Sequence, residues 1–248
     1  MDQHHYLQRI GVTTDSLPTL HYLAHLQEQH MFHVPFENLD VIKQTPIVLD
    51  TERFYAKVVN RFRGGFCYEL NGLFHWLLKT VGYDGRLLAA TVQKDDGTWA
   101  LEGSHATNMV TIDGLSYLVD VGFGDSIRQP IPFSGEIITD ISGSYRLTLL
   151  TDQTYDFQKQ QNGKWKTTYR VSTVPKQLQD FQPMCEFNQT SPLSPFTKAR
   201  LATIATKDGR ITLSGSTLTI TKEQDKKKID LQEQDIDEVL DQYFHIQL

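Results

Sequence analysis

The sequence predicts an α+β protein in which helices come first and an antiparallel sheet or small barrel follows. Apolar residues recur at helical spacing up to about residue 82. From Gly85 onward, short apolar stretches alternate with turn signals such as Asp113-Gly114 and Asn162-Gly163, which is typical of antiparallel strands. Strand-like stretches return after residue 200, and a helix over Asp235–Phe244 is expected to close the chain.

Composition excludes several classes of function. The 248 residues carry a net charge of −6, which gives no sign of a nucleic-acid-binding surface. Neither a signal peptide nor an apolar run near the ~20 residues of a membrane span is present, so we expect a cytoplasmic protein. The two cysteines form no C-x-x-C pattern and no H-E-x-x-H motif occurs, so no metal site is expected.

Three helices are expected in the first part of the chain. Ser16 is predicted to cap a helix carrying several leucines, and Asp50 to cap a second. The third follows a sharp turn at Gly64-Gly65, because two glycines allow backbone conformations that other residues rarely adopt. Its apolar spacing predicts one buried face, formed by Phe66, Leu70, Leu73, Phe74, Leu77, Leu78 and Val81.

The rest of the chain is predicted to be mostly strands. A short helix is expected within Val174–Phe187, an extended link at Ser191–Phe196, and a solvated turn at Lys226–Lys228. The predicted strands are Leu87–Val92, Ala106–Ile112, Tyr117–Val121, Tyr145–Leu150, Trp165–Val171, Arg200–Thr206, Arg210–Leu213 and Thr217–Thr221.

Cys67 falls in the first turn of the third helix. There the partial positive charge of a helix N-terminus favours thiolate over thiol. A thiol in this position is either a nucleophile or a small core residue, and its partners decide between the two. Cys185 has no base near it in sequence and is expected to be a passive buried thiol.

A base for the thiol can come from the hairpin around Asp113-Gly114. In a two-residue loop, facing residue numbers sum to 227, so Asp120 faces Thr107 and His105 is its diagonal neighbour on the same side of the sheet. The sequence therefore predicts a His105–Asp120 pair, while its meeting with Cys67 stays open at this point. Glu37 and Arg63 are candidates for a buried ion pair that braces the Cys67 turn.

Together these segments resemble the arylamine N-acetyltransferase family. The resemblance covers about residues 30 to 215, and its most specific parts are the Arg-Gly-Gly-Phe-Cys and Asp-Val-Gly-Phe-Gly segments. The matching segments are Pro35–Leu39, Arg63–Asn71, Ser104-His105, Asp120–Gly124, Ser191–Phe196 and Gly209–Leu213.

The resemblance implies three domains and a papain-like Cys-His-Asp site. These are a helical bundle over residues 1–84, a β-barrel over 85–190 and an α/β lid over 191–248. It also implies ping-pong transfer from acetyl-CoA, as co-substrate, to a small aromatic amine, hydrazine or N-hydroxyarylamine. Cys67 would be the nucleophile, His105 the general acid and base, and Asp120 the group that orients His105.

The same resemblance suggests residues that bind the substrates. Phe36 and Phe123 would line the pocket for the aromatic acceptor. Gly103 and Gly124 would lie near the acetyl-CoA, where backbone N–H groups can also stabilise an oxyanion. No metal ion is implied.

Other functions are compatible with the same motifs. A relative that forms an amide on a carrier-bound polyketide would share every motif above. A transglutaminase-like or papain-like thiol hydrolase keeps the order Cys, His, Asp but lacks the Arg63–Asn71 pattern. A binding module that has lost the chemistry is disfavoured, because all three triad residues are present.

Overall fold

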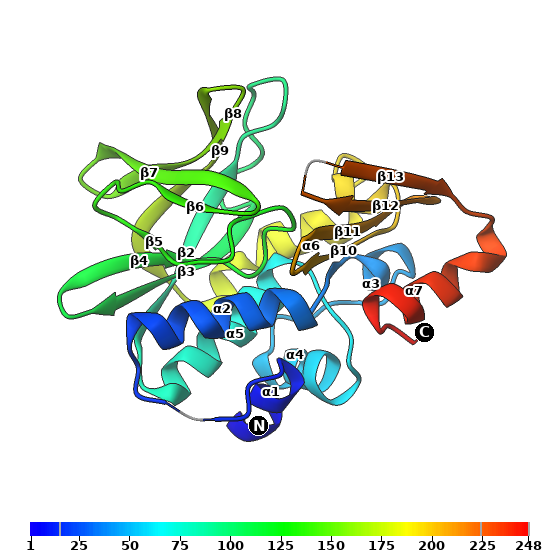
Figure 1. The fold of residues 1–248 in the computed structure, drawn as a ribbon, viewed down its shortest axis with the longest axis horizontal. Coiled ribbons are helices and arrows are strands. Elements are labelled where there is room, and N and C mark those ends of the chain that lie inside the picture. The colour runs from blue at the N-terminus through cyan, green and yellow to red at the C-terminus, as the bar shows by residue number, and fades with distance from the viewer. Residues whose placement is uncertain (15, 224, 248) are drawn as a thin grey trace.

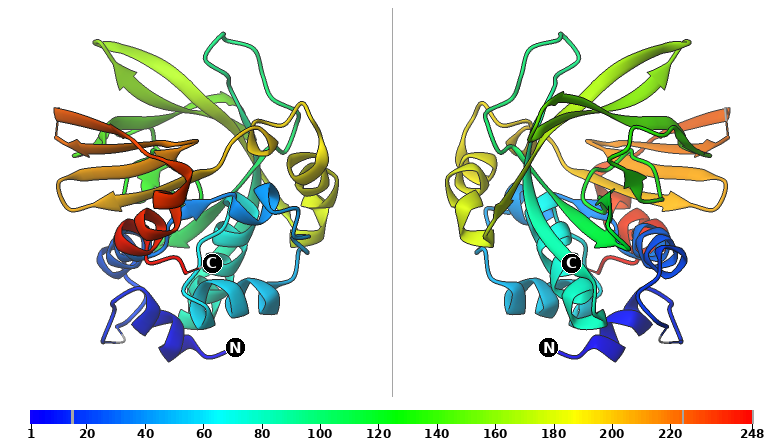
Figure 2. Two further views of the ribbon diagram at one scale, coloured as in Figure 1. Left: turned by 90° about the vertical axis from the view of Figure 1, so that its right-hand side faces the viewer. Right: turned by 90° about the vertical axis from the view of Figure 1, so that its left-hand side faces the viewer.

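The computed structural model describes residues 1–14, 16–223 and 225–247. Helices gather on one side, with two antiparallel sheets next to each other above them (Figure 1). The side views show most helices below the sheets, with one helix, drawn in yellow, beside them (Figure 2). This arrangement confirms the predicted α+β class.

The N-terminal part is helical as predicted, with two short helices, α1 and α3, that the sequence did not reveal. Helix α1 is capped by the Asp2 side chain. The helices are α1 Gln3–Arg9, α2 Leu20–His33, α3 Leu39–Ile42, α4 Thr51–Tyr55 with the π-helical continuation η1 Ala56–Asn60, and α5 Cys67–Val81.

The predicted cap at Ser16 is wrong. Helix α2 begins at Leu20, and the Thr19 side chain accepts a hydrogen bond from the Tyr22 N–H. The residue before a proline is disfavoured in helical conformation, which excludes Leu17 before Pro18 from the helix. The cap at Asp50 is confirmed, since its carboxylate accepts from the Arg53 N–H at 3.0 Å.

Helix α5 is the centre of the larger core. Its apolar face is fully buried except at Val81, which is half-buried, and the helix ends at Gly82, whose φ of +107° favours glycine. The preceding turn passes very close to the chain at residue 35. A Cβ on Gly64 would lie 2.0 Å from the Pro35 carbonyl oxygen, so only glycine fits there.

The central sheet has eight antiparallel strands and curls into a nearly closed barrel in which β5 contacts β7. The strand order is β5-β4-β3-β2-β9-β8-β7-β6. The strands are β2 Asp84–Val92, β3 His105–Ile112, β4 Leu115–Val119, β5 Ile131–Pro132, β6 Ile138–Asp140, β7 Gly143–Thr151, β8 Thr154–Gln161 and β9 Lys164–Lys176.

The hairpin between β3 and β4 has the predicted register. Val119 pairs with Asn108 and Leu115 with Ile112, so facing numbers sum to 227. Asp113 and Gly114 both have positive φ, as a two-residue hairpin turn of type I′ requires. Strand β8 was not predicted from sequence, because only its middle is buried and most of its residues are polar.

The second sheet is built around the last third of the chain, but it begins with a strand from the helical part. Phe36 pairs with Thr203 and Glu37 with Ala202, so β1 joins the edge of β10. The order is β1-β10-β11-β12-β13, and the elements are β1 Phe36–Glu37, β10 Leu201–Thr206, β11 Gly209–Ser214, β12 Thr217–Lys222, β13 Asp225–Asp230, η4 Glu233–Asp235 and α7 Ile236–Phe244.

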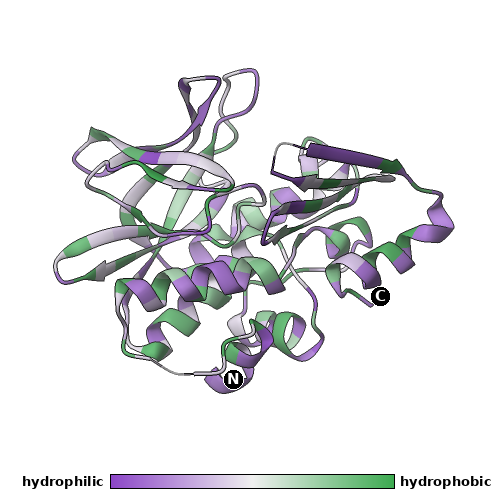
Figure 3. Ribbon diagram, viewed as in Figure 1, coloured by the Kyte–Doolittle hydropathy of each residue, from purple (hydrophilic) through white to green (hydrophobic). Residues whose placement is uncertain are grey.

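Two local predictions in this part are wrong. Lys226–Lys228 lie in strand β13 and not in a turn, although their side chains are exposed and the strand is hydrophilic (Figure 3). The link at Ser191–Phe196 is not fully extended. Ser194 caps a 3₁₀ helix, η3 Pro195–Thr197, by accepting from the Phe196 N–H.

The predicted short helix before this link is present, and it extends past the end of the expected range. Strand β9 continues to Lys176, followed by η2 Leu178–Phe181 and α6 Gln182–Thr190. None of the helices in the described residues is both long enough and apolar enough to span a membrane.

Candidate active site

Cys67 is the first residue of helix α5, as the sequence predicts. Its side chain is buried, and the Phe66 N–H just before it donates to the Glu69 carboxylate at 3.1 Å. The first amides of a helix have no partners within the helix. The thiol therefore lies where backbone N–H groups favour negative charge.

His105 and Asp120 form the predicted pair. His105 begins strand β3 and Asp120 follows strand β4, so the hairpin register brings them together. The distance from His105 Nε2 to Asp120 Oδ2 is 2.6 Å, and both side chains are buried. Cys67 lies near enough to His105 to help raise the pKa of the imidazole. The structure thus brings the three residues together, which the sequence pattern alone left open.

The charges of His105 and Asp120 stabilise each other. Burial alone would lower the pKa of His105, but the charge of Asp120 and hydrogen bonds to Asp120 and Cys67 raise it to about 10. Burial alone would raise the pKa of Asp120, but the charge and hydrogen bond of His105 hold it below the usual value. An imidazolium beside a carboxylate is therefore the favoured state.

Asp120 is held by four donors. Oδ1 accepts from the Asn71 side chain and the Gly122 N–H, each at 2.9 Å, and Oδ2 accepts from His105 and from the Tyr169 hydroxyl at 2.9 Å. Burial raises the pKa of Tyr169 well above its usual value, so this hydroxyl remains a donor. The sequence analysis missed Asn71 and Tyr169 in this role, although Asn71 lies within the Arg63–Asn71 segment.

Asn71 also joins helix α5 to the barrel. Its side-chain nitrogen donates to the Ala106 carbonyl at 2.6 Å, and its side-chain oxygen accepts from the Val121 N–H at 3.1 Å. A Cβ on Gly122 would lie 2.5 Å from this side chain and 2.9 Å from the Cys67 Cα. Because the Gly122 backbone approaches α5 this closely, Cys67 lies next to the β3–β4 hairpin that brings His105 and Asp120 together.

A buried network of charges braces the turn before Cys67. The predicted ion pair between Arg63 and Glu37 is present at 2.8 Å, and the same guanidinium contacts Asp40 at 3.0 Å. Lys57 completes the network, with its Nζ 2.8 Å from Asp40 and 2.9 Å from Glu69. The sequence did not point to Lys57, because its place in the π-helical η1 is not evident from helical spacing.

These contacts fix the charge state of the network. Burial alone would lower the pKa of Lys57, but Glu69, Glu37 and Asp40 raise it above its usual value. Burial raises the pKa of Glu69 to about 6, against the opposing effect of Lys57. Removing the Lys57 cation would leave the carboxylates of Asp40 and Glu69 without one of their ion-pair partners.

A cavity of about 890 Å³ opens beside the thiol. Its wall includes Cys67 and His105 as well as Phe36 and Phe123, the two aromatic residues expected at an acceptor site. Further apolar residues come from strand β2 and the loop that follows it, from helix α6 and from the segment that leads into β10, namely Val92, Trp99, Leu101, Met184, Phe187, Leu193, Pro195, Phe196 and Leu201. The cavity therefore presents a nucleophile and a base to an apolar ligand.

The two glycines expected near acetyl-CoA lie in different surroundings. Gly124 lines the cavity. Gly103 is not among the lining residues, and its N–H donates to the Thr91 hydroxyl at 3.3 Å. That N–H is therefore engaged, and the role of both glycines toward acetyl-CoA stays a prediction.

Cys185 is buried as expected. The side-chain nitrogen of Gln189 lies 3.2 Å from its sulfur, and burial raises its pKa to about 12. A thiol with this pKa is almost entirely protonated at neutral pH.

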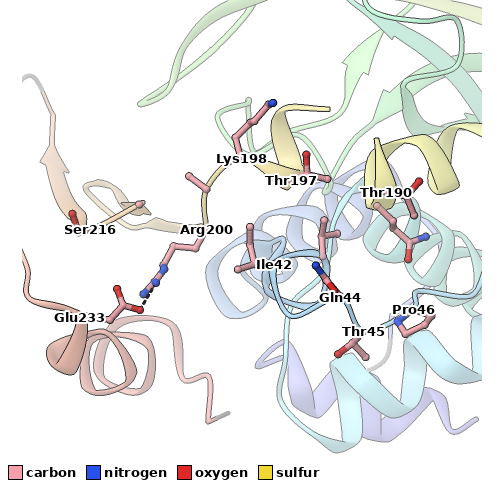
Figure 4. Close-up of a pocket in the computed structure, with 14 residues that line it drawn as sticks. Ile42, Gln44, Thr45, Pro46, Thr190, Thr197, Lys198, Arg200, Ser216 and Glu233 are labelled. Carbon is pink, nitrogen blue, oxygen red and sulfur yellow. Dashed lines mark hydrogen bonds and ion pairs between the residues drawn. The ribbon is translucent and has the colours of Figure 1, made fainter. Parts of the chain in front are cut away.

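A second hollow of about 800 Å³ lies between the helical part and the C-terminal segment that forms the second sheet (Figure 4). Arg200 and Glu233 form an ion pair on one side of it, and Gln44, Thr45 and Pro46 lie on the other. None of its lining residues is Cys or His, so this hollow lacks the groups of the triad.

Within the described residues, no cluster of His, Cys, Asp and Glu has the geometry to hold a metal ion.

Comparison with known proteins agrees with this geometry. The N-acetyltransferase family model matches residues 19–248. Human arylamine N-acetyltransferase 1 is 31% identical, and the match covers 100% of this chain and 95% of the human protein. The chain belongs to the arylamine N-acetyltransferase family. It is therefore an acyltransferase.

One solved structure and one further relative are also similar to this chain. A Bacillus cereus arylamine N-acetyltransferase structure matches with a TM-score of 0.93 at 27% identity, covering 99% of this chain and 98% of that one, and has a unique Cys-His-Glu triad. The proansamycin X synthase of Amycolatopsis mediterranei is 32% identical over 72% of this chain and 70% of its own.

We predict that Lys57→Met lowers the free energy of unfolding by about 3–5 kcal/mol, because it leaves buried carboxylates without a neighbouring cation. Urea unfolding measures the loss. Lys166→Met is the matched control, since it removes a lysine paired with an exposed carboxylate, at a cost below about 1 kcal/mol. Equal losses in the two variants would contradict the role assigned to the network.

We also predict a pH-dependent contribution of His105 to stability. The unfolded chain releases the His105 proton near pH 6.5, whereas the folded chain holds it to about pH 10, so this contribution falls as pH rises between those values. The lowered pKa of Asp120 acts in the opposite direction, because its contribution is lost as pH falls below the usual Asp pKa of 3.8.

The measurement compares Cys67→Ala with Cys67→Ala/His105→Gln, so that neither protein contains the thiol. The stability difference should shrink by at least about 1 kcal/mol between pH 6 and pH 9, since one pKa unit corresponds to about 1.4 kcal/mol. A difference that stays constant over this range would show that His105 is not held as an imidazolium.

Proposed function

We propose that the protein transfers an acetyl group from acetyl-CoA to small aromatic amines, hydrazines and N-hydroxyarylamines by a ping-pong mechanism through Cys67. The observation that carries the proposal is the Cys67–His105–Asp120 arrangement in the wall of an apolar cavity. Membership of the family supports acetyl-CoA as the donor.

In the first half-reaction the Cys67 thiolate attacks the acetyl carbonyl carbon. The protonated His105 donates its proton to the departing CoA sulfur, which leaves as the free thiol, and a thioester remains on Cys67. Asp120 holds the imidazole in place through Nε2, so the other ring nitrogen is directed to the thiol.

In the second half-reaction an amine attacks the thioester. The neutral His105 takes a proton from the amine nitrogen, and the Cys67 sulfur leaves as thiolate. The products are the acetylated amine and the resting thiolate–imidazolium pair. Phe36 and Phe123 offer aromatic faces to an arylamine ring in the cavity.

A second candidate function is the formation of an amide on a carrier-bound polyketide. The similarity to proansamycin X synthase favours keeping this candidate, because that relative shares the family with the arylamine N-acetyltransferases. An amide synthase that joins a tethered amine and acyl group would show little transfer from acetyl-CoA to free amines. A thiol hydrolase would instead release acetate without needing an amine.

We predict that Cys67→Ala abolishes acetyl transfer to an arylamine such as 4-anisidine, while Cys185→Ala retains nearly all of it. Transfer is followed by the loss of free amine, and thermal unfolding confirms that both variants are folded. The two variants remove the same atom from buried cysteines, so they form a matched pair. A folded but inactive Cys185→Ala enzyme would overturn the assignment of the nucleophile.

A further inference from the structure

The hydroxyl of Tyr68 joins three elements at one buried point. Tyr68 follows the nucleophile in helix α5, and its side chain is fully buried. The hydroxyl donates to the Gly103 carbonyl oxygen at 3.2 Å and accepts from the Asn188 side-chain nitrogen, also at 3.2 Å. Burial raises the pKa of Tyr68 well above its usual value, so the hydroxyl keeps the proton that it donates.

The two partners of this hydroxyl belong to different segments of the cavity wall. Gly103 lies in the loop between β2 and β3, which contributes Leu101 to the wall, and Asn188 lies in the wall itself as part of α6. The segments touch, because a Cβ on Gly103 would lie 4.0 Å from Met184 Cγ of α6. Tyr68 does not line the cavity, so it reaches a ligand only through these neighbours.

Asn188 extends the connection to a third segment of the wall. Its carbonyl oxygen accepts from the Ser194 hydroxyl at 3.1 Å. The same hydroxyl caps η3, which carries Phe196 in the cavity wall. The helix of the nucleophile is therefore connected through one phenol to the β2–β3 loop, to α6 and to the start of η3.

The other attachments of the β2–β3 loop lie nearer the surface. The Trp99 ring packs against the Arg170 guanidinium at 4.5 Å, and Asp95 pairs with Lys166 at 3.1 Å where both side chains are exposed. Exposed ion pairs contribute little, whereas a buried carbonyl or amide that loses its partner is costly. The buried phenol is thus the stronger constraint on the position of the loop.

We propose that the Tyr68 hydroxyl is a positioning group for acetyl transfer, which holds the β2–β3 loop and α6 in the arrangement that encloses a bound ligand. The inference rests on the proposed function and adds a residue to it that acts through Gly103 and Asn188. Without the hydroxyl, the enclosing arrangement is populated for only part of the time, and the apparent affinity for ligands falls by that fraction. The contacts that hold Asp120 and His105 do not involve Tyr68, so the reactivity of the thiol should stay the same.

The test is Tyr68→Phe, which removes one oxygen and keeps the ring that packs against Phe66 and Phe181. In transfer from acetyl-CoA to 4-anisidine, KM for acetyl-CoA should rise about fivefold while kcat changes less than about twofold. Alkylation of Cys67 by iodoacetamide, without CoA or amine, should keep its wild-type rate. Amide hydrogen exchange in α6 should become faster, because the helix loses one of its buried attachments.

Tyr83→Phe is the matched control and should leave KM and the exchange of α6 unchanged. Tyr83 is also buried, and its hydroxyl donates to the Thr19 carbonyl at 2.9 Å, away from the cavity. A double-mutant cycle adds Asn188→Leu. In that background Tyr68→Phe should raise KM by a smaller factor, because the two residues act through one shared hydrogen bond.

Four results would overturn the proposal. Slower alkylation of Cys67 together with a lower kcat would mean that Tyr68 acts on the thiol and not on the wall. Faster exchange of α6 without a change in KM would make the hydroxyl structural only. Unchanged exchange of α6 would show that the hydroxyl does not hold this helix, and equal effects of Tyr83→Phe would indicate a general loss of stability. Absence of transfer to any amine in the wild type would instead refute the proposed function, and the exchange of α6 would still decide whether Tyr68 holds the wall.

Discussion

The site depends on one close crossing of the chain, where the segment before β1 passes over the turn that leads into α5. The Pro35 carbonyl oxygen occupies the space that a side chain on Gly64 would need. Phe36 forms a bridge with Gly65, and the Glu37 N–H donates to the Gly65 carbonyl at 2.9 Å. This crossing fixes the start of α5, and with it the position of Cys67.

Buried charges hold that crossing together. Glu37 and Asp40 come from one side, and Lys57, Arg63 and Glu69 come from the other. Such a network need not add much stability compared with apolar packing, but breaking it is costly because single charges remain buried. It therefore specifies one arrangement of the turn. Strand β1 pairs with β10, so the second sheet is attached to the same crossing.

Asp120 plays the corresponding part on the barrel side. Its four donors come from α5, from β3, from β9 and from its own loop, so a single carboxylate ties the nucleophile's helix to the strand that carries the base. Because these donors are in place before any ligand binds, little reorganisation is needed when charge moves between thiol and imidazole.

Sequence reasoning reached the parts of this arrangement that depend on local patterns. Helical spacing after Gly64-Gly65 placed Cys67 at a helix start, and the Asp113-Gly114 turn gave the register that joins His105 to Asp120. It could not find Tyr169, because β9 lies next to β2 only through long-range pairing. Lys57 was missed for a similar reason, since its burial among carboxylates is set by the tertiary fold.

Local rules also failed where a neighbouring residue competes. Ser16 and Thr19 are both acceptable helix caps, and Pro18 between them decides in favour of Thr19. Strand β13 carries three consecutive lysines, which are typical of a turn or loop, yet its pairing with β12 and its edge position make them compatible with a strand.

The central claim is that Cys67 carries the acetyl group between the two substrates. The most direct measurement is the intact mass of the purified protein after mixing with acetyl-CoA in the absence of amine. The account predicts one added acetyl group, located on Cys67 by peptide mapping and lost when an arylamine is added. An unmodified protein whose Cys67 still reacts rapidly with an alkylating agent would contradict it.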